Sequence, residues 1–246
     1  MAPPAPGLLS HDQTVVRPWL IDELAYSGPE HRDPAFVAGY DHKQGNPDPS
    51  EDLAVLQAHL RGRTSTLIDM GAGTGRFAIA AAREFGRVVA IDVSPVMMSV
   101  LRKRAAEAGL SNLHGVQAGF LSYDHSGPPV DAVYSRNALH HLPDFWKAVA
   151  LDRIGRMLKP NGVLRLHDLI YDFQPSQADD VLSRWLDGAV DDPVKGYTRE
   201  DFSTHIRTEH STFRWLLEPM LAAAGLEIVT ADFRQSVYGA YTCVKG

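Results

Sequence analysis

The sequence predicts an α/β fold, in which a doubly wound and mostly parallel sheet of seven strands carries helices on both faces and a helical cap. Three observations support this prediction. Short apolar runs alternate with helical stretches along the middle of the chain, and a glycine-dense turn follows the first of these runs. The last two apolar runs stand too close together for a parallel crossover, so we expect the last strand to be antiparallel.

Five apolar runs have the length and composition of buried strands. They are Thr66–Met70, Val88–Asp92, Leu113–Gln117, Val130–Ser135 and Val163–Asp168. Stretches with helical spacing lie between them at Arg76–Glu84, Pro95–Ala108 and Asp144–Leu158. Strands that alternate with helices in this way predict a parallel sheet.

Local chemistry marks several boundaries of these elements. Ser94 is suited to cap the second helix, with Pro95 at its first position and Gly109 placed to end it. Asn161 and Gly162 form a turn signal after the third helix.

The two closing runs, Leu226–Ala231 and Val237–Val244, are separated by residues 232–236 alone. A gap of this length allows a hairpin and no crossover helix. Before the hairpin, apolar residues recur at helical spacing and are expected in the core. They are Trp215, Leu216, Leu217, Met220 and Leu221.

Two segments fall outside the alternation. Residues 1–49 are predicted to form an N-terminal helical cap, with a weak helical pattern around Val15–Tyr26, and residues 50–170 the core. Residues 171–211 look helical and follow the fifth strand, and residues 212–246 return a helix and the hairpin to the sheet. Because ligands of open α/β sheets bind outside the carboxyl ends of the strands, we expect residues 171–211 to form a lid.

Charge and cysteine content exclude several classes of protein. The 246 residues hold 24 Lys and Arg against 30 Asp and Glu, a net charge of −6 that argues against a nucleic-acid partner. A single cysteine, Cys243, rules out an internal disulfide and a cysteine metal cluster. We find no export signal at the start and no apolar run near the roughly 20 residues that a membrane span needs. The expectation is a cytoplasmic protein, monomer or homodimer, with no membrane partner.

The most informative motif is the turn Gly71-Ala72-Gly73-Thr74-Gly75, which follows a predicted strand and opens a helix. Glycines there allow positive φ and let a ligand lie against the backbone. Asp92 stands 21 positions after Gly71, at the end of the next strand, where a carboxylate can accept both hydrogen bonds of a ribose diol. The pattern indicates an adenosine cofactor.

The spacing of the motif distinguishes between two such cofactors. A nicotinamide-binding turn usually has its third glycine one position later, whereas here Gly75 is followed by the bulky Arg76 and Phe77. Asp69 lies two residues before Gly71, where it would repel a pyrophosphate and attract a sulfonium or ammonium group. Both features favour S-adenosylmethionine over a dinucleotide.

Two further segments carry a resemblance to a known family. They are Val130-Asp131-Ala132-Val133-Tyr134-Ser135-Arg136-Asn137-Ala138-Leu139-His140-His141-Leu142 and Leu158-Lys159-Pro160-Asn161-Gly162-Val163-Leu164. With the glycine turn and Asp92, they make residues 53–168 resemble the class I S-adenosylmethionine-dependent methyltransferases. The resemblance is closer to the small-molecule branch that includes the ubiquinone and menaquinone biosynthesis enzymes, and it implies a Rossmann-like methyltransferase fold.

The resemblance implies cofactor contacts along the whole ligand. Asp69 and the backbone of Gly71, Ala72, Gly73 and Gly75 would hold the methionine moiety, and Ser135 and Arg136 would reach its amine and carboxylate. Asp92 would bind the ribose. The adenine would lie among Val93, Met97, Ala118, Gly119 and Phe120. Many relatives carry an Asp at the position of Gly119 to bond the adenine amino group, and this chain lacks it.

His140 and His141 follow the fourth strand and are the candidates for a general base, with Asp168 and Tyr171 as positioning groups. Alternatively, one histidine packs against the cofactor and the other is a loop or helix-cap residue. A metal set would have to combine His140, His141, His167 and Asp168. Because residues 167 and 168 point to opposite faces of a strand, the sequence predicts no metal site.

Three other residues are weighed as packing or surface groups. Tyr40 could fold over the cofactor, although packing within the cap is the preferred interpretation. His205 and His210 are five positions apart, off a common helical face, and are expected to be exposed or capping.

The leading hypothesis for function is methyl transfer from S-adenosylmethionine to a small-molecule acceptor, with S-adenosylhomocysteine as product. The alternative keeps the fold and uses bound S-adenosylmethionine in a cyclisation or rearrangement. A non-catalytic binding module and a nicotinamide dehydrogenase are weaker alternatives. The chain lacks the Asn/Asp-Pro-Pro-Tyr sequence of nucleic-acid amino-methylating enzymes after the fourth strand.

Overall fold

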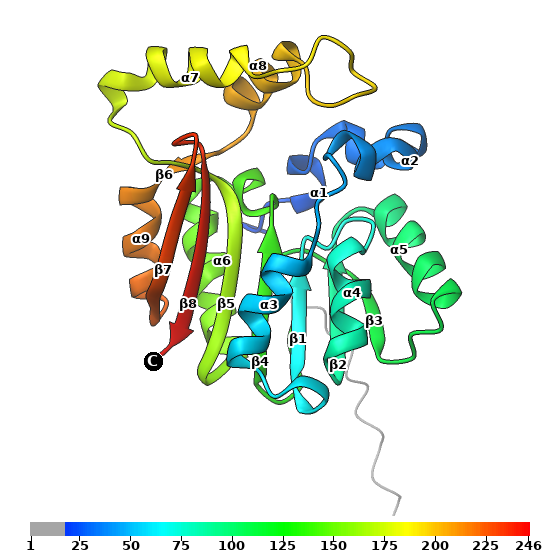
Figure 1. Ribbon diagram of the computed structural model, residues 1–246. Helices are drawn as coiled ribbons and strands as arrows, with labels where there is room; N and C mark the ends of the chain where they lie inside the picture. The colour runs from blue at the N-terminus through cyan, green and yellow to red at the C-terminus, as the bar shows by residue number, and fades with distance from the viewer. Residues whose placement is uncertain (1–17) are drawn as a thin grey trace, which may run out of the picture.

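The main sheet has seven strands in the order β3-β2-β1-β4-β5-β8-β7 (Figure 1). The computed structural model describes residues 18–246, so residues 1–17 of the predicted N-terminal cap lie outside the described residues. The strands are β1 (Thr66–Met70), β2 (Arg87–Asp92), β3 (Leu113–Gln117), β4 (Val130–Arg136), β5 (Leu158–Tyr171), β7 (Leu226–Arg234) and β8 (Tyr238–Lys245). Strands β1 to β5 pair in parallel, and β8 runs antiparallel between β5 and β7, as the hairpin predicted. A two-residue strand, β6 (Thr212–Phe213), pairs with the end of β5 and has no counterpart in the prediction.

Helices cover both faces of this sheet. In Figure 1, α3 (Ser50–His59) and α4 (Arg76–Glu84) lie in front of the strands, and α6 (Asp144–Met157) lies behind them. The two remaining helices of the core are α5 (Pro95–Glu107) and α9 (Arg214–Ala223). Neighbouring residues of β1 enter different cores: Leu67 packs with α3, α4 and α5, and Ile68 packs with α6 and α9. This alternation is the reason that the strands read as short runs of apolar residues.

The predicted boundary signals are found in the structure. Ser94 Oγ accepts a hydrogen bond from Met97 N at 3.1 Å, and Gly109 adopts φ 64° just beyond α5. Asn161 adopts φ 63°, so the predicted turn occurs inside the long strand β5. The pairing of β4 with β5 shifts register there, between Val130 and Ala132.

Two segments far apart in sequence lie over the carboxyl ends of the strands (Figure 1). The N-terminal one comprises α1 (Glu23–Tyr26), a 3₁₀ turn at Pro29–Arg32 and α2 (Pro34–Lys43). The other comprises a 3₁₀ turn at Pro175–Gln177, α7 (Ala178–Asp187) and α8 (Arg199–Thr208). They contact each other, because Lys43 Nζ lies 3.1 Å from Asp201 Oδ1 and Gln44 Nε2 donates to the Tyr197 hydroxyl at 2.6 Å.

The burial of side chains along α9 corrects the prediction that all of its large apolar residues lie in the core. Leu217 and Leu221 are fully buried, whereas Trp215 is 49% exposed and stacks on Phe213. Two positions along a helix turn a side chain by about 200°, so Trp215 faces away from the side on which Leu217 and Leu221 pack. Leu216 and Met220 are half-buried.

Within residues 18–246, none of the helices has both the length and the apolar character that crossing a membrane requires.

Candidate functional site

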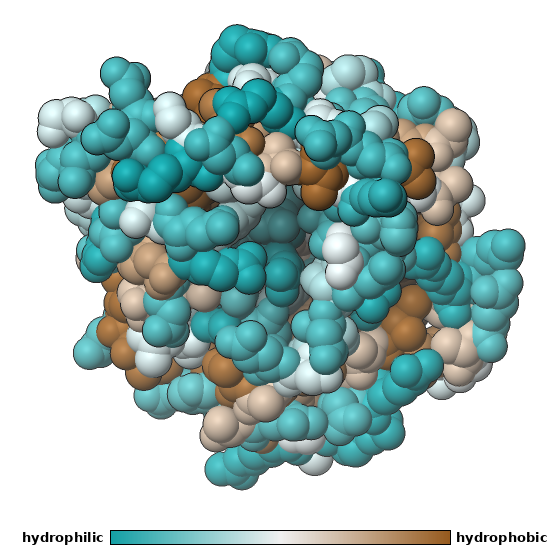
Figure 2. Space-filling view, turned by 45° about the horizontal axis from the view of Figure 1, so that its top comes forward, coloured by the Kyte–Doolittle hydropathy of each residue, from teal (hydrophilic) through white to brown (hydrophobic). Residues whose placement is uncertain are grey.

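Two adjoining cavities lie over the carboxyl ends of β1, β2 and β4. Figure 2 shows a hollow near the centre of this face, bordered by hydrophilic groups. The first cavity is lined by Glu23, Ser27, His31, Tyr40, Gly71, Gly73, Asp92, Val93, Met97, Ala118, Gly119, Phe120, Asn137, Ala138, His141 and Leu142. The second is lined by Tyr40, Asp41, Gln44, Pro47, Asp48, Pro49, Asp69, Gly71, Ala72, Gly73, Thr74, Arg76, Phe77, Tyr134, Arg136 and Asn137. Gly71 and Gly73 border both, so the glycine turn lies between the two cavities.

The three glycines of the turn serve different purposes. All three adopt positive φ, at 76° for Gly71, 54° for Gly73 and 84° for Gly75. A Cβ on Gly71 would lie 2.3 Å from Ala138 Cβ, and one on Gly75 would lie 2.6 Å from Leu101 Cγ. Gly75 therefore allows α4 to pack against α5 and lines neither cavity, whereas Gly71 and Gly73 expose backbone to both.

Asp92 is tied to the glycine turn. Its Oδ2 accepts a hydrogen bond from Gly73 N at 2.8 Å, and its Oδ1 accepts a hydrogen bond from Ser94 N at 2.8 Å. Burial raises the pKa of Asp92, and these two backbone donors act in the opposite direction. The carboxylate thus stands at a fixed place in the wall of the first cavity.

The predicted adenine contacts also line the first cavity, namely Val93, Met97, Ala118, Gly119 and Phe120. Sequence reasoning missed Glu23, which enters this cavity from α1. Its carboxylate accepts from Leu121 N at 3.0 Å, from Ser122 N at 2.9 Å and from Ser122 Oγ at 2.7 Å. A Cβ on Gly119 would lie 2.3 Å from Glu23 Oε1, so the glycine makes room for the glutamate. The missing Asp at position 119 was the only signal in the sequence that pointed to such a group.

The second cavity contains the predicted methionine contacts Asp69, Ala72 and Arg136. Asp69 is 2% exposed, and none of residues 18–246 forms a hydrogen bond with its Oδ2. Burial and the nearby charge of Asp92 raise the pKa of Asp69 well above its usual value. Ser135 is fully buried, and neither cavity includes it.

Asp52 of α3 is a second acidic group that sequence reasoning missed. It is 1% exposed and accepts from Arg165 Nε at 2.8 Å and from the Tyr134 hydroxyl at 2.9 Å. His167 Nε2 lies 2.6 Å from the Asp52 carboxylate, and Arg136 lies 3.6 Å from it. Burial would raise the pKa of Asp52, but His167 and Arg165 lower it to about 2. His167 thus points away from Asp168, as the alternation of a strand requires.

The two predicted histidines, in a 3₁₀ turn at Leu139–His141, occupy different environments. His141 lines the first cavity, whereas His140 lies behind it with Nδ1 2.5 Å from Asp168 Oδ1. Burial alone would lower the pKa of His140, but the charges of Asp168 and Glu209 raise it to about 9. Burial and the neighbouring charge of His140 lower the pKa of His141 well below its usual value.

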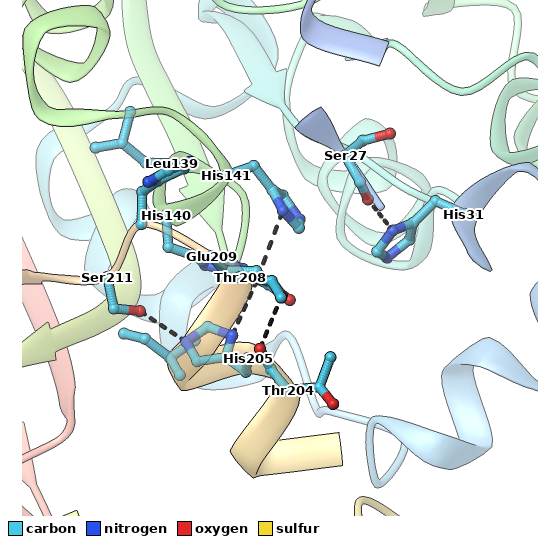
Figure 3. Close-up of polar contacts among 12 residues, drawn as sticks. Ser27, His31, Leu139, His140, His141, Thr204, His205, Thr208, Glu209 and Ser211 are labelled. Carbon is cyan, nitrogen blue, oxygen red and sulfur yellow. Dashed lines mark hydrogen bonds and ion pairs between the residues drawn. The ribbon is translucent and has the colours of Figure 1, made fainter. Parts of the chain in front are cut away.

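The segment that contains α7 and α8 adds to this cluster His205, which sequence reasoning placed elsewhere, and Glu209, which it missed. The side chain of His205, which was expected at the surface or at a cap, is 11% exposed, and its Nδ1 lies 2.9 Å from Glu209 Oε2. Figure 3 shows His140, His141 and His205 grouped around Glu209, with Ser211 beside His205. The prediction for His205 was wrong because the chain after α8 returns to the sheet and covers the side of the helix that carries His205, while Arg207 and Thr208 stay exposed. His210 is half-buried.

The tyrosines considered in the sequence analysis lie at different places relative to the two cavities. Tyr171 lines neither cavity and packs against Phe173 and Phe213, with ring centroids 5.2 and 5.7 Å apart. Tyr40 lines both cavities, and its Cε1 would lie 3.6 Å from a Cβ on Gly73. Tyr40 also packs within the cap, with its ring centroid 6.1 Å from that of Phe36, so the preferred interpretation holds and the residue borders the cavities as well.

Comparison with known proteins places the chain among methyltransferases. A family model described as a methyltransferase domain matches residues 67–162. An uncharacterized methyltransferase of Mycobacterium tuberculosis is 30% identical over 145 residues, which is 58% of this chain and 70% of that protein. A ubiquinone biosynthesis O-methyltransferase of Xylella fastidiosa is 33% identical over 135 residues, covering 53% of this chain and 54% of that protein.

Solved structures share the fold at low sequence identity. The magnesium protoporphyrin IX methyltransferase of Synechocystis with bound S-adenosylhomocysteine has a TM-score of 0.65 at 13% identity, covering 92% of this chain and 100% of that one. An S-adenosylmethionine-dependent methyltransferase of Aquifex aeolicus has a TM-score of 0.60 at 17% identity, covering 87% and 99% of the two chains. The [4+2]-cyclase SpnF also has a TM-score of 0.60, at 18% identity and 80% coverage of both chains. A mostly parallel sheet with an antiparallel C-terminal strand is therefore common to this chain and to the Aquifex aeolicus methyltransferase.

Proposed function

The chain belongs to the class I S-adenosylmethionine-dependent methyltransferases, and from this premise we propose that it transfers a methyl group from S-adenosylmethionine to a small-molecule acceptor. One observation carries the proposal. The glycine turn lies between two cavities, with the fixed carboxylate of Asp92 in one and the unpartnered carboxylate of Asp69 in the other. An adenosine joined to a charged amino acid has matching groups at both ends.

In this proposal the nucleoside occupies the first cavity. Asp92 accepts hydrogen bonds from the ribose hydroxyls, and the adenine lies among the apolar side chains of Val93, Met97 and Phe120. The methionine moiety reaches past Gly73 into the second cavity. There its ammonium group meets Asp69 and its carboxylate meets Arg136, which gives the buried Asp69 carboxylate a partner.

Methyl transfer is an in-line displacement, in which the acceptor atom attacks the methyl carbon and the sulfur leaves with the electron pair of the broken bond. The protein therefore acts mainly by aligning the two reactants and excluding water. The N-terminal segment and the lid meet over the cavities and provide that cover. His141 lies in the wall of the first cavity and is the imidazole placed to take a proton from the acceptor.

The reaction is tested by incubating the protein with S-adenosylmethionine and a panel of small acceptors, among them hydroxyl-bearing compounds, because one relative is an O-methyltransferase. Methyl transfer predicts a product heavier by one CH₂ and an equal amount of S-adenosylhomocysteine. A product of unchanged mass, formed while S-adenosylmethionine is retained, would instead support a cyclisation or rearrangement.

His141→Ala is expected to lower kcat by about 100-fold or more for an acceptor that must lose a proton, the range typical of general base catalysis. The affinity for S-adenosylhomocysteine should change only a few-fold, because the imidazole is proposed to face the acceptor. His42→Ala removes an exposed histidine from α2 and is the matched control. Unchanged kcat in His141→Ala would remove the proposed role.

Glu23 is proposed to take the place of the acidic residue that many relatives carry at position 119. Glu23→Ala should weaken S-adenosylhomocysteine binding by about 10- to 100-fold, because a hydrogen bond to a charged acceptor contributes about 1.5–3 kcal/mol. Gly119→Asp alone should also weaken binding, since its side chain would collide with Glu23.

The double variant Glu23→Ala/Gly119→Asp should recover most of the affinity, because it moves the carboxylate to the other element without a collision. Calorimetric titration of the four proteins with S-adenosylhomocysteine gives the comparison. If the double variant loses as much affinity for S-adenosylhomocysteine as the two single variants lose together, Glu23 only supports the backbone of residues 121 and 122.

A further inference from the structure

We propose that His140, His205 and Glu209 form a binding site for a divalent transition-metal ion of the Zn²⁺ class. One nitrogen of each imidazole and one oxygen of the carboxylate all lie within 4.8 Å of one another. The ligands come from separate elements, since His140 follows β4 and the other two are at the end of α8 (Figure 3). Folding of the lid onto the core therefore assembles the site.

Two imidazole nitrogens approach the same carboxylate oxygen. His140 Nε2 and His205 Nδ1 each lie 2.9 Å from Glu209 Oε2, and among residues 18–246 this buried oxygen has no hydrogen-bond partner. Ligand atoms this close together can be shared by one ion that lies between them. Ligand distances of about 2.0–2.2 Å to one ion bring N and O ligand atoms to separations similar to these.

The outer nitrogen of each imidazole is held by a polar neighbour. His140 Nδ1 lies 2.5 Å from Asp168 Oδ1, and His205 Nε2 lies 2.7 Å from Ser211 Oγ. Such partners fix the ring orientation, and metal binding displaces the proton from the other nitrogen, which then presents its lone pair to the ion. In the part of the chain that the structure describes, both imidazoles thus direct their free nitrogen toward the Glu209 carboxylate.

The donor set indicates which ions would bind. Two imidazole nitrogens and one carboxylate suit zinc, iron, cobalt or nickel, whereas magnesium and calcium prefer oxygen ligands alone. Three protein ligands leave a further coordination position for water or a substrate atom. The charge is also favourable, because a dication would offset the negative charges of Glu209 and Asp168.

These three ligands differ from the set considered in the sequence analysis, which combined His140 and His141 with His167 and Asp168. His167 instead contacts Asp52, and Asp168 orients His140 without joining the ligands. His141 borders the site, with Nδ1 3.6 Å from Glu209 Oε2, and also lines the first cavity. On the proposed function, His141 would therefore lie between the ion's ligands and the acceptor.

Metal-stripped protein should be titrated with CoCl₂ and, separately, ZnCl₂, using calorimetry and the visible absorption of bound cobalt. One ion per chain is expected. His205→Ala and Glu209→Gln should lose this binding, and Ser211→Ala should weaken it by about 10- to 100-fold, as is usual for a group that orients a ligand. His210→Ala removes a neighbouring histidine outside the cluster and should bind as the unaltered protein does.

All variants should keep their affinity for S-adenosylhomocysteine, because none of these residues lines the two cavities. His141→Ala should still bind the ion. A loss of turnover in this variant and a loss of metal binding in the others can therefore be distinguished. Unaltered protein that binds the cofactor product but takes up no cobalt or zinc would overturn the metal site and leave the proposed function intact. Binding that persists equally in His205→Ala and Glu209→Gln would place the ion elsewhere and also overturn it.

Discussion

Asp52→Asn is expected to lower the free energy of unfolding by about 3–5 kcal/mol, the cost typical of removing one partner from a buried ion pair. Asp52 is 1% exposed and Arg165 is 3% exposed, so the guanidinium would keep its charge in the core without a carboxylate. Urea unfolding followed by circular dichroism measures the change. Glu51→Gln makes the same charge change at the neighbouring exposed position of α3 and should change stability by less than about 0.5 kcal/mol.

The pH dependence of stability gives the same interaction a second readout. The pKa of Asp52 is lowered to about 2 in the folded chain, from a usual value of 3.8. Its contribution is therefore complete above about pH 4 and is lost as the pH falls from there toward 2, amounting to about 2 kcal/mol. Asp52→Asn should unfold with a shallower dependence on pH in this window. If both proteins lose stability in parallel, Asp52 is not the group that holds Arg165.

Asp92→Ala is expected to weaken S-adenosylhomocysteine binding by at least about 100-fold, since two hydrogen bonds to a charged acceptor contribute about 3 kcal/mol or more. The same change removes the acceptor of Gly73 N, so the glycine turn also loses the contact that fixes it. Isothermal titration calorimetry measures the affinity. Asp124→Ala removes an exposed carboxylate after β3 and is the control for net charge. Equal affinities for Asp92→Ala and the unaltered protein would mean that the ribose lies elsewhere.

The sheet could be predicted from the sequence because its signals are local. Strand β1 and helix α4 have the predicted bounds, since an apolar run and an amphipathic stretch meet at a turn that only glycines allow. The cap at Ser94 likewise depends on residues within one helical turn. The glycine turn and Asp92 could be combined into one site because consecutive parallel strands end at the same edge.

The remaining site residues could not be predicted because their neighbours are distant in sequence. Glu23 lies 98 residues before Leu121, from whose backbone N–H its carboxylate accepts a hydrogen bond. No periodicity in the sequence connects α1 with that loop. His205 and Glu209 depend on how the lid returns to β5, which helical spacing alone does not determine. Tyr40 reaches Gly73 only once the N-terminal segment has packed over the strands.

We propose that one S-adenosylmethionine spans the two cavities, with its ribose on Asp92 and its amino group at Asp69. A crystal structure with S-adenosylhomocysteine would show where the ligand lies. We expect both ribose hydroxyls within hydrogen-bond distance of the Asp92 carboxylate, and the methionine amine beside Asp69 Oδ2, which has no partner among residues 18–246. A nucleoside bound away from the glycine turn, or a methionine moiety directed away from Asp69, would contradict it.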